Sequence, residues 1–489
     1  MEVASVPKPA MREPTLLEAL IPVVAMGFFV GVGYAVMGIR IELLLLASAA
    51  VTAAIAWRLG MTWELMQQGI VESIGKAMPA ILIVIVVGAL IASWLISGTI
   101  PTIVYYGLKM ISPSWFLATA CILCSLVSMI IGTSWGTIGT VGVALMGIAE
   151  GLGISSAQTA GAVVAGAYFG DKLSPFSDTT NLAPIAAKSN LYDHIGHMLW
   201  TTMPAWVIGM VVYVIVGRGH GGAVTSKDVA DLSAALEANF HLSPILLLPA
   251  AIALGAAVLK KPVIPGMLLS IVVALVMALT MQNLGESVLG KPSASEATHP
   301  TWVRAARTLV FGVTPATDST SLNRILARGG MESMMGTTLI AICAFAFAGI
   351  ATRAGMMMVI VHALSRIART TGQLVAATVA ACLTVAGITG NSYLAILIPG
   401  ELFAKAYKER GLAAKNLSRT TEDSGTVVVP LIPWSISAAF IGDTLHVSAI
   451  HYAPWAILCY LGFMFALVYG FTGFTIAPLK REDETLPGS

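Results

Sequence analysis

Long apolar runs dominate the chain, and most are about as long as a helix that crosses a membrane. Roughly 20 apolar residues in a helix are needed to cross about 30 Å of hydrocarbon. By this criterion the sequence predicts transmembrane helices over 16–38, 41–59, 78–98, 196–217, 243–259, 264–282, 336–354 and 452–476. The hydrophobic pattern therefore predicts an all-α polytopic membrane protein.

Two further apolar regions, 114–152 and 371–409, are broken near the middle by glycine with hydroxyl or amide residues. The breaks read "GTSWGT" over 132–137 and "GITGNSY" over 387–393. Non-helical backbone at membrane depth is tolerated only where protein or a water-filled cavity satisfies its polar groups. We interpret both regions as re-entrant hairpins, which gives about ten transmembrane helices plus two hairpins.

Short motifs recur in the same order in the two halves of the chain. The matched pairs are "GIVESIG" (69–75) with "GGMESMMG" (329–336), "GTSW" (132–135) with "GNSY" (390–393), and "SDT" (177–179) with "SGT" (424–426). If the hairpins do not cross the membrane, an odd number of crossings separates the copies, so the second copy is inverted. If they crossed, the copies would be parallel. Paired interrupted helices favour two inverted repeats, an arrangement typical of secondary transporters.

Loops and tails complete the predicted organisation. The segments are an N-terminal tail (1–15), a first repeat (16–217), a linker loop (218–242), a second repeat (243–476) containing an extramembrane loop (283–335), and a C-terminal tail (477–489). Lysine and arginine concentrate in the loops on one side, which places both termini in the cytoplasm. The 283–335 loop is the exception, because it carries several basic residues on the outer side. We expect a multi-pass protein of the cytoplasmic membrane.

Composition limits the alternatives further. Only 11% of residues are charged and the net charge is +2, so no basic surface suggests a nucleic-acid partner. The five cysteines lie in apolar runs without metal-ligand grouping. The CxxC spacing of Cys121 and Cys124 falls inside an apolar helix, where we interpret both as packing residues.

The stretch "FGDKLSPFSDTTNLAP" (169–184) places unusual polarity directly after a small-residue apolar helix. Asp178 is the first choice for an ion-carrying carboxylate that binds Na+, because a cation and a proton compete for one buried carboxylate. Asp171 is the second choice. Hydroxyl and amide oxygens suit alkali cations, and the neighbouring candidates are Ser177, Thr179, Thr180 and Asn181. The alternative is that these residues only cap helix ends.

Further candidates lie at the hairpin tips and in the second half. At the tips they are Thr133, Ser134, Asn391 and Ser392, although serine and threonine also bond back to helix backbone. In "TTEDSGTVVVPLIPW" (420–434) they are Glu422, Asp423, Ser424 and Thr426. The two acidic residues bind ions directly, or form a solvated entry or a surface salt bridge with Arg419. We interpret "IGDTLHVSAIHYAPW" (441–455) as a polar external loop; pH sensing by its histidines is the alternative.

Two motifs connect the chain to a known family. "GAYFGDKLSPFSDTTNLAP" (166–184), with "GTSWGTIGT" (132–140) upstream, resembles the NhaC family of sodium/proton antiporters, and "TEDSGTVVVPLIPWS" (421–435) is similar to that family's second conserved region. The resemblance runs from about residue 16 to 476. It implies an ion-transporter-type fold with inverted repeats, two hairpins and an elevator-like motion. The site residues it implies are Asp171, Ser174, Asp178, Thr179, Thr180, Asn181, Glu422, Asp423, Ser424 and Thr426.

The expected function is secondary antiport of Na+ against H+ across the cytoplasmic membrane, with no cofactor besides the transported ions. The alternative is a Na+/H+-coupled transporter of a small organic substrate, such as a malate- or lactate-type carboxylate or an amino acid. No HExxH or GxSxG motif supports a membrane enzyme, and a channel is a separate alternative. The expected partners are the lipid bilayer, Na+, H+ and, in the alternative, the organic substrate. A homodimer is expected by analogy only.

Overall fold

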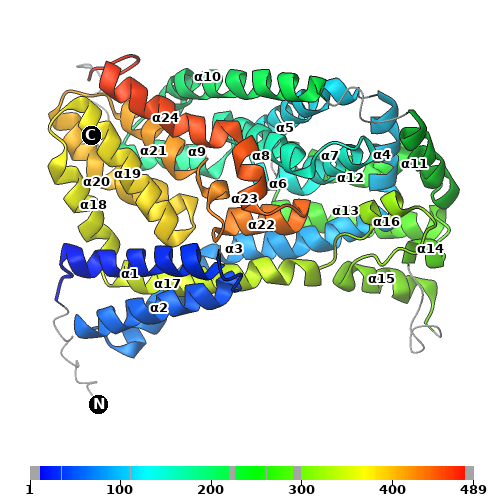
Figure 1. Ribbon diagram of the computed structural model, residues 1–489, viewed down its shortest axis with the longest axis horizontal. Helices are drawn as coiled ribbons and strands as arrows, with labels where there is room; N and C mark the ends of the chain where they lie inside the picture. Colours follow the sequence, from blue (N-terminus) through cyan, green and yellow to red (C-terminus); the bar gives the residue numbers. More distant parts are fainter. Residues whose placement is uncertain are drawn as a thin grey trace.

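The computed structural model describes residues 12–34, 36–110, 112–219, 226–259, 261–289 and 299–479. Within these ranges the protein is all-helical, apart from one isolated bridge between Leu412 and Pro478. The helices form an elongated bundle in which the start of the first helix and the end of the last lie toward the same end of the long axis (Figure 1). Most of the predicted tails, 1–11 and 480–489, and parts of the predicted loops, 220–225 and 290–298, lie outside the described residues.

The described helices confirm a polytopic membrane protein. Eight of them are long and apolar enough to span a bilayer, or up to eleven if each bent pair is one span. The predicted number, about ten, lies within this range, but two of the eight, Pro113–Ile131 and Thr371–Thr389, belong to the regions predicted as hairpins. The span predicted at 78–98 belongs to a longer helix, α3 (Trp63–Ile96), which packs along α17 (Met335–Arg353) (Figure 1).

The first half of the chain begins with α1 (Leu16–Phe28) and α2 (Ile41–Arg58), and its other helices come next. They are α3, α4 (Thr99–Met110), α5 (Phe116–Ile131), α6 (Ser134–Thr137), α7 (Val143–Gly151), α8 (Ser156–Leu173), α9 (Asp178–Ala187) and α10 (Leu191–Arg218). A π-helical turn joins α6 to α7. The connecting helices are α11 (Ser226–Asn239), α12 (Leu248–Val258), α13 (Val263–Met281), α14 (Glu286–Leu289), α15 (Thr301–Phe311) and α16 (Thr320–Leu326).

The helices of the second half come after the connecting helices. They are α17, α18 (Met356–Ile367), α19 (Thr371–Thr389), α20 (Ser392–Glu409), α21 (Ala414–Gly425), α22 (Ile436–Leu445), α23 (Ala449–Tyr452) and α24 (Ile457–Thr472). The predicted 452–476 span is not straight, because α23 and α24 meet at a 60° bend. The predicted 283–335 loop is partly packed against α3, since the Gly330 amide donates a hydrogen bond of 2.7 Å to Gly88.

Both predicted hairpins contain a sharp turn at a glycine. Gly132 ends α5 and Gly390 ends α19, both in the left-handed backbone region that favours glycine. Thr133 and Asn391 then cap the helices that return from the two tips. A second pair of breaks interrupts α8–α9 and α21–α22, where Ser177 caps α9. The helix breaks indicated by the glycine and proline clusters are therefore present.

The structural correspondence between the halves corrects one sequence match. Ser177–Thr179 begins a helix, whereas Ser424–Thr426 ends one, so these motifs are not equivalent. In the second half it is Ser435 that caps a helix as Ser177 does, at the start of α22. Asp171 and Asp423 each lie three residues before the C-cap of their helix. The second break is longer than the first, and sequence spacing alone concealed this shift.

The segment predicted to be a polar external loop is also different. Asp443 lies in α22, and its carboxylate accepts hydrogen bonds from the amide and hydroxyl of Thr337. Its neighbour Phe440 stacks on Trp135, with ring centroids 4.8 Å apart. This stacking connects α22 to the tip of the first hairpin. The segment is therefore mostly helical, with its polar residues around the break between α22 and α23, rather than a loop throughout.

Close packing of α5 against α8 positions the first break. A Cβ atom on Gly166 or Gly170 would lie 2.3 Å or 2.2 Å from a backbone oxygen of α5. These two glycines are one turn apart on α8 and allow the helix backbones to touch. The same approach fixes the end of α8, where Asp171 follows Gly170 directly.

We expect the Gly170→Ala variant to lose about 1–3 kcal/mol of stability, because the added methyl group clashes with the α5 backbone. Thermal unfolding in detergent measures this loss. Gly196→Ala is the matched control, since nothing lies within 4 Å of a Cβ at that helical position. Equal unfolding temperatures for both variants would contradict the close packing.

Candidate functional site

A cavity of about 220 Å³ lies where the four helix breaks meet. Both hairpin tips line it, and so do the starts of α9 and α22 and the residue that ends α21. From these segments the lining residues are Gly132, Thr133, Ser134, Trp135, Ser177, Asp178, Thr179, Gly390, Asn391, Ser392, Tyr393, Thr426, Ile436 and Ser437. The structure therefore brings together candidates that lie far apart in the sequence.

Asp171 is a buried carboxylate on the cavity wall, 8% exposed. Its Oδ2 atom accepts a hydrogen bond of 3.1 Å from the backbone amide of Ser134. Ser134 is the first residue of a helix, where amides have no intrahelical partner and favour an anion. The first hairpin tip thus holds Asp171 by its backbone.

Asp178, the first choice from sequence, is exposed rather than buried. It is the first residue of α9 and lies in the cavity, where its Oδ2 accepts a hydrogen bond of 3.1 Å from the Tyr393 hydroxyl. Tyr393 belongs to the second hairpin. Asp178 and Asp171 are near enough to interact electrostatically. The burial that motivated the choice of Asp178 is found instead at Asp171, Glu422 and Asp423.

Glu422 is fully buried, and neither carboxylate oxygen has a hydrogen-bond partner within the described residues. The hydroxyls of Thr179 and Thr426 lie close to it, although neither forms a hydrogen bond of good geometry. Both threonines line the cavity, so Glu422 lies just behind its wall. Further buried oxygens without partners in the described chain follow at Asp423 Oδ2, Ser424 Oγ and Thr426 Oγ1.

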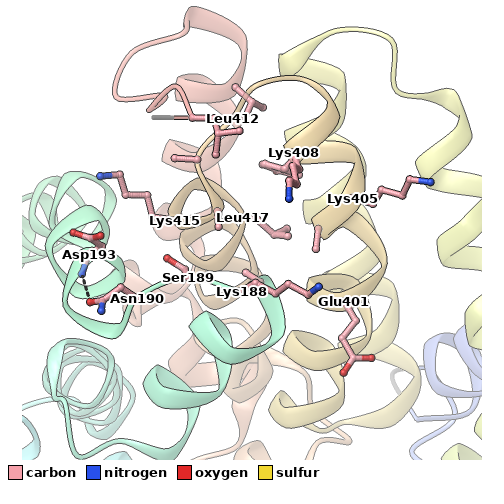
Figure 2. A pocket seen from close by; sticks show the side chains of 16 residues that line it. Lys188, Ser189, Asn190, Asp193, Glu401, Lys405, Lys408, Leu412, Lys415 and Leu417 are labelled. Atoms are coloured by element: carbon pink, nitrogen blue, oxygen red, sulfur yellow. Dashed lines mark hydrogen bonds between the residues drawn. The ribbon is translucent and has the colours of Figure 1, made fainter. Parts of the chain in front are cut away.

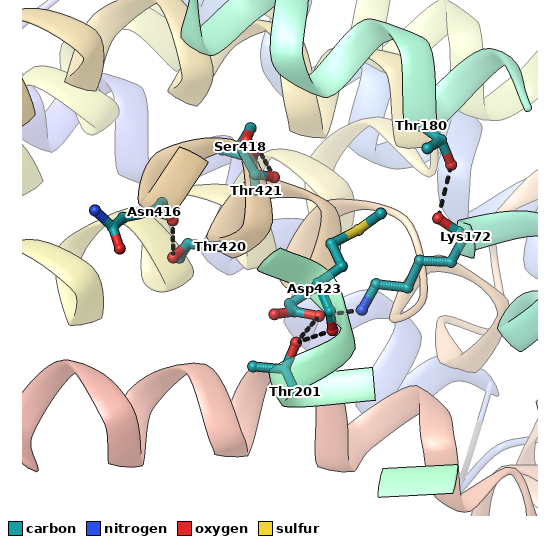
Figure 3. A network of polar contacts seen from close by, with 9 residues as sticks. Lys172, Thr180, Thr201, Asn416, Ser418, Thr420, Thr421 and Asp423 are labelled. Atoms are coloured by element: carbon teal, nitrogen blue, oxygen red, sulfur yellow. Dashed lines mark hydrogen bonds and ion pairs between the residues drawn. The ribbon is translucent and has the colours of Figure 1, made fainter. Parts of the chain in front are cut away.

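Asp423 points to a different neighbour. Its Oδ1 atom forms an ion pair with Lys172 of α8 and accepts a hydrogen bond of 3.2 Å from Thr201 of α10 (Figure 3). Both members of the pair are buried. Neither Thr201 nor this pairing of Lys172 could be identified from sequence motifs, because the contact joins segments about half the chain apart.

Arg419 is buried rather than part of a surface salt bridge. Its side chain is 0% exposed. Its Nη1 atom donates a hydrogen bond of 2.9 Å to Thr475, and its guanidinium lies 5.9 Å from the Tyr469 ring centroid. Among the described residues it forms no ion pair. The interpretation of Glu422 and Asp423 as a solvated entry also fails, because both are 0% exposed.

Several candidates have a local structural role. Ser177, Thr133 and Asn391 accept hydrogen bonds from the amides that begin α9, α6 and α20. Asn181 donates to backbone carbonyls at the α8–α9 break, and Ser174 accepts from an amide there. Thr180 donates to carbonyls at the end of α8. Ser392 lines the cavity at the second tip. The capping interpretation therefore describes what most of these side chains do.

A second, larger cavity of about 380 Å³ lies near the junction of α9 and α10. Figure 2 shows Lys188 and Lys408 directed toward it, while Lys405 and Lys415 point away. Its acidic lining residues are Asp193 and Glu401. None of these side chains is buried. Unlike the first cavity, it contains no buried carboxylate, so it is the weaker candidate for ion binding.

Comparison with known proteins agrees with this geometry. Residues 166–474 match the Na+/H+ antiporter family. The chain is 44% identical over 472 residues to an uncharacterized Na(+)/H(+) antiporter of Haemophilus influenzae, covering 96% of this chain and 98% of that one. It is 37% identical to the Na(+)/H(+) antiporter NhaC of Alkalihalophilus pseudofirmus, over 85% and 86% of the two chains. It is 32% identical to the malate-2H(+)/Na(+)-lactate antiporter of Bacillus subtilis, over 95% of this chain and 96% of that one.

The match begins within α8 and covers both breaks, α8–α9 and α21–α22, which border the cavity. The relatives extend over nearly the whole chain. The expected resemblance is thereby confirmed. The chain belongs to the Na+/H+ antiporter family, in its NhaC branch.

Proposed function

We propose that the protein exchanges Na+ for H+ across the cytoplasmic membrane, and that Glu422 is the carboxylate for which the two ions compete. One observation carries the assignment. Both Glu422 oxygens are buried without hydrogen-bond partners in the described structure, beside two hydroxyls of the cavity wall. A buried carboxylate needs a proton or a cation to offset its desolvation. Carboxylate and hydroxyl oxygens are hard ligands suited to Na+.

The charge around the break supports a monovalent cargo. The buried carboxylates here are Asp171, Glu422 and Asp423, and the buried cations are Lys172 and Arg419. When all are ionised, three negative charges against two positive charges leave one negative charge uncompensated. One Na+ or one proton balances it. In this proposal the cavity carboxylate Asp178 guides the cation inward from the exposed side.

The two hairpins provide the alternating access. Both tips contact a carboxylate of the α8–α9 break: the Ser134 amide donates a hydrogen bond to Asp171, and the Tyr393 hydroxyl donates one to Asp178. A loaded site would change which side it faces when these contacts move together. We further propose that 16–217 and 243–476 are inverted repeats with both termini in the cytoplasm. The similar caps after the breaks, at Thr133 and Asn391 and at Ser177 and Ser435, support the repeat. The excess of lysine and arginine in the loops on one side supports the orientation.

An organic substrate is the second candidate. The cavity volume of about 220 Å³ exceeds what a bare cation needs, and one relative is described as a malate-2H(+)/Na(+)-lactate antiporter. An anionic substrate needs a free cation in the cavity wall. Lys76 is the only lysine or arginine in the described lining, and it is paired with Glu72 at 2.8 Å. Ion exchange is therefore the better-supported function.

We expect the Glu422→Gln variant to lose Na+-dependent exchange, because an amide cannot alternate between a proton and a cation. Sodium-driven dequenching of a pH-sensitive dye in inverted vesicles measures the exchange. Glu401→Gln, which alters a carboxylate of the second cavity, is the matched control and should exchange normally. Full exchange by Glu422→Gln would refute the assigned role.

The Asp178→Asn variant is expected to raise the Na+ concentration for half-maximal exchange by about threefold to tenfold, with little change in the maximal rate. The reason is that an exposed charge attracts the cation without holding it in the buried position, a contribution of roughly 1 kcal/mol. Rates measured over a Na+ series in the same vesicles test this. A complete loss of exchange would instead return Asp178 to the central role.

Uptake of labelled malate, lactate and amino acids into proteoliposomes distinguishes the two candidates. We expect no Na+-dependent uptake, because the described cavity wall offers no free cation to bind an organic anion. Vesicles that contain Glu422→Gln protein are the control for leakage. Saturable uptake of one of these compounds that disappears without Na+ would favour the second candidate.

A further inference from the structure

A buried ion pair lies directly beside the proposed cation position. The Lys172 ammonium contacts Asp423 Oδ1, with side-chain exposures of 1% and 0% (Figure 3). Thr201 donates to the same oxygen, whereas Oδ2 has no hydrogen-bond partner in the described structure. Moving two charges out of water costs about as much free energy as their pairing returns. Stability alone therefore does not explain this pair.

The pair shares its location with Glu422. Glu422 and Asp423 are adjacent in α21, and Lys172 interacts electrostatically with the first while it contacts the second. Two neighbouring carboxylates with hydroxyl oxygens nearby are the ligand chemistry of a divalent hard cation such as Ca2+. Lys172 adds one positive charge to this group. The charge still required is that of a single monovalent ion.

Lys172 is suited to this position by its chemistry and its place in the fold. It lies in the last turn of α8, and Asp423 lies near the end of α21, so both helix C-termini favour a cation there. An ammonium group is a compact point charge on a flexible stem. The other buried cation, Arg419, makes its hydrogen bond with Thr475 instead of a carboxylate.

We propose that Lys172 is a tethered cation that fills one of two cation positions at the Glu422–Asp423 carboxylates. It thereby makes the site accept one monovalent cation and reject divalent cations. Lys172 is then a specificity-determining residue. This inference rests on the proposed function, in which Glu422 holds the transported ion.

The test is thermal unfolding of the purified protein in detergent, titrated with NaCl or CaCl2 at constant ionic strength. The wild-type protein should be stabilised by Na+ and not by Ca2+. In Lys172→Met, Ca2+ should become stabilising, and half-maximal stabilisation by Na+ should occur at about a tenfold lower concentration. An unchanged ion preference in Lys172→Met would overturn the proposal.

A charge-neutral variant separates the charge of Lys172 from its packing. Lys172→Met combined with Asp423→Asn removes both members of the pair, so the net charge of the group stays the same. This double variant should reject Ca2+ like the wild-type protein. A response to Ca2+ in the double variant would show that cavity size rather than charge sets the preference, against the proposal.

Asp423→Asn alone keeps the proposal testable if Lys172→Met does not fold. In this variant Lys172 loses its charged partner Asp423, and its ammonium group competes with Na+ for Glu422. Half-maximal stabilisation by Na+ should therefore require about a tenfold higher concentration. An unchanged Na+ concentration would contradict the proposal. Glu422→Gln in the same titration tests the underlying function separately: it should abolish the Na+ response, and a retained response would refute the role of Glu422 whatever Lys172 does.

Discussion

Each half of the chain contains a helix that stops inside the protein, and the free ends of these helices govern the surrounding structure. Where α8 and α21 end, backbone carbonyls and acidic side chains face an interior without bulk water. Such groups are tolerated only if protein groups or a cavity satisfy them. The hairpin tips supply part of this satisfaction, as the Ser134 amide does for Asp171. The oxygens left without partners include both of Glu422, and this is the observation on which the proposed cation site rests.

At the end of α8, close helix packing positions a buried ion pair. The close approach of α8 to α5 through Gly166 and Gly170 fixes the end of α8. That end carries Lys172 to Asp423, so a contact between the two halves depends on helix packing elsewhere. The Trp135–Phe440 stacking makes a second connection, from the first hairpin tip to α22. A motion that opens the cavity must therefore carry several of these contacts along as a unit.

The sequence predicted the helical fold and the four breaks that surround the cavity, because glycine, proline and apolar run length act locally, but it did not predict the 60° bend between α23 and α24. Gly132 and Gly390 are clear examples, since a left-handed turn is a property of the residue itself. Burial was predicted less well. Asp178 and Asp171 are seven residues apart in one polar stretch, and each contacts a hairpin tip, yet only Asp171 is buried. Arg419 looked like a surface residue because its partners, Thr475 and Tyr469, lie more than 45 residues away.

The most direct measurement is a high-resolution structure of the protein determined in Na+ and again without it. The account predicts a Na+-dependent density peak bounded by the Glu422 carboxylate and the hydroxyls of Thr179 and Thr426, with Lys172 still at Asp423. A peak in the open cavity beside Asp178, with Glu422 unchanged between the two conditions, would contradict it.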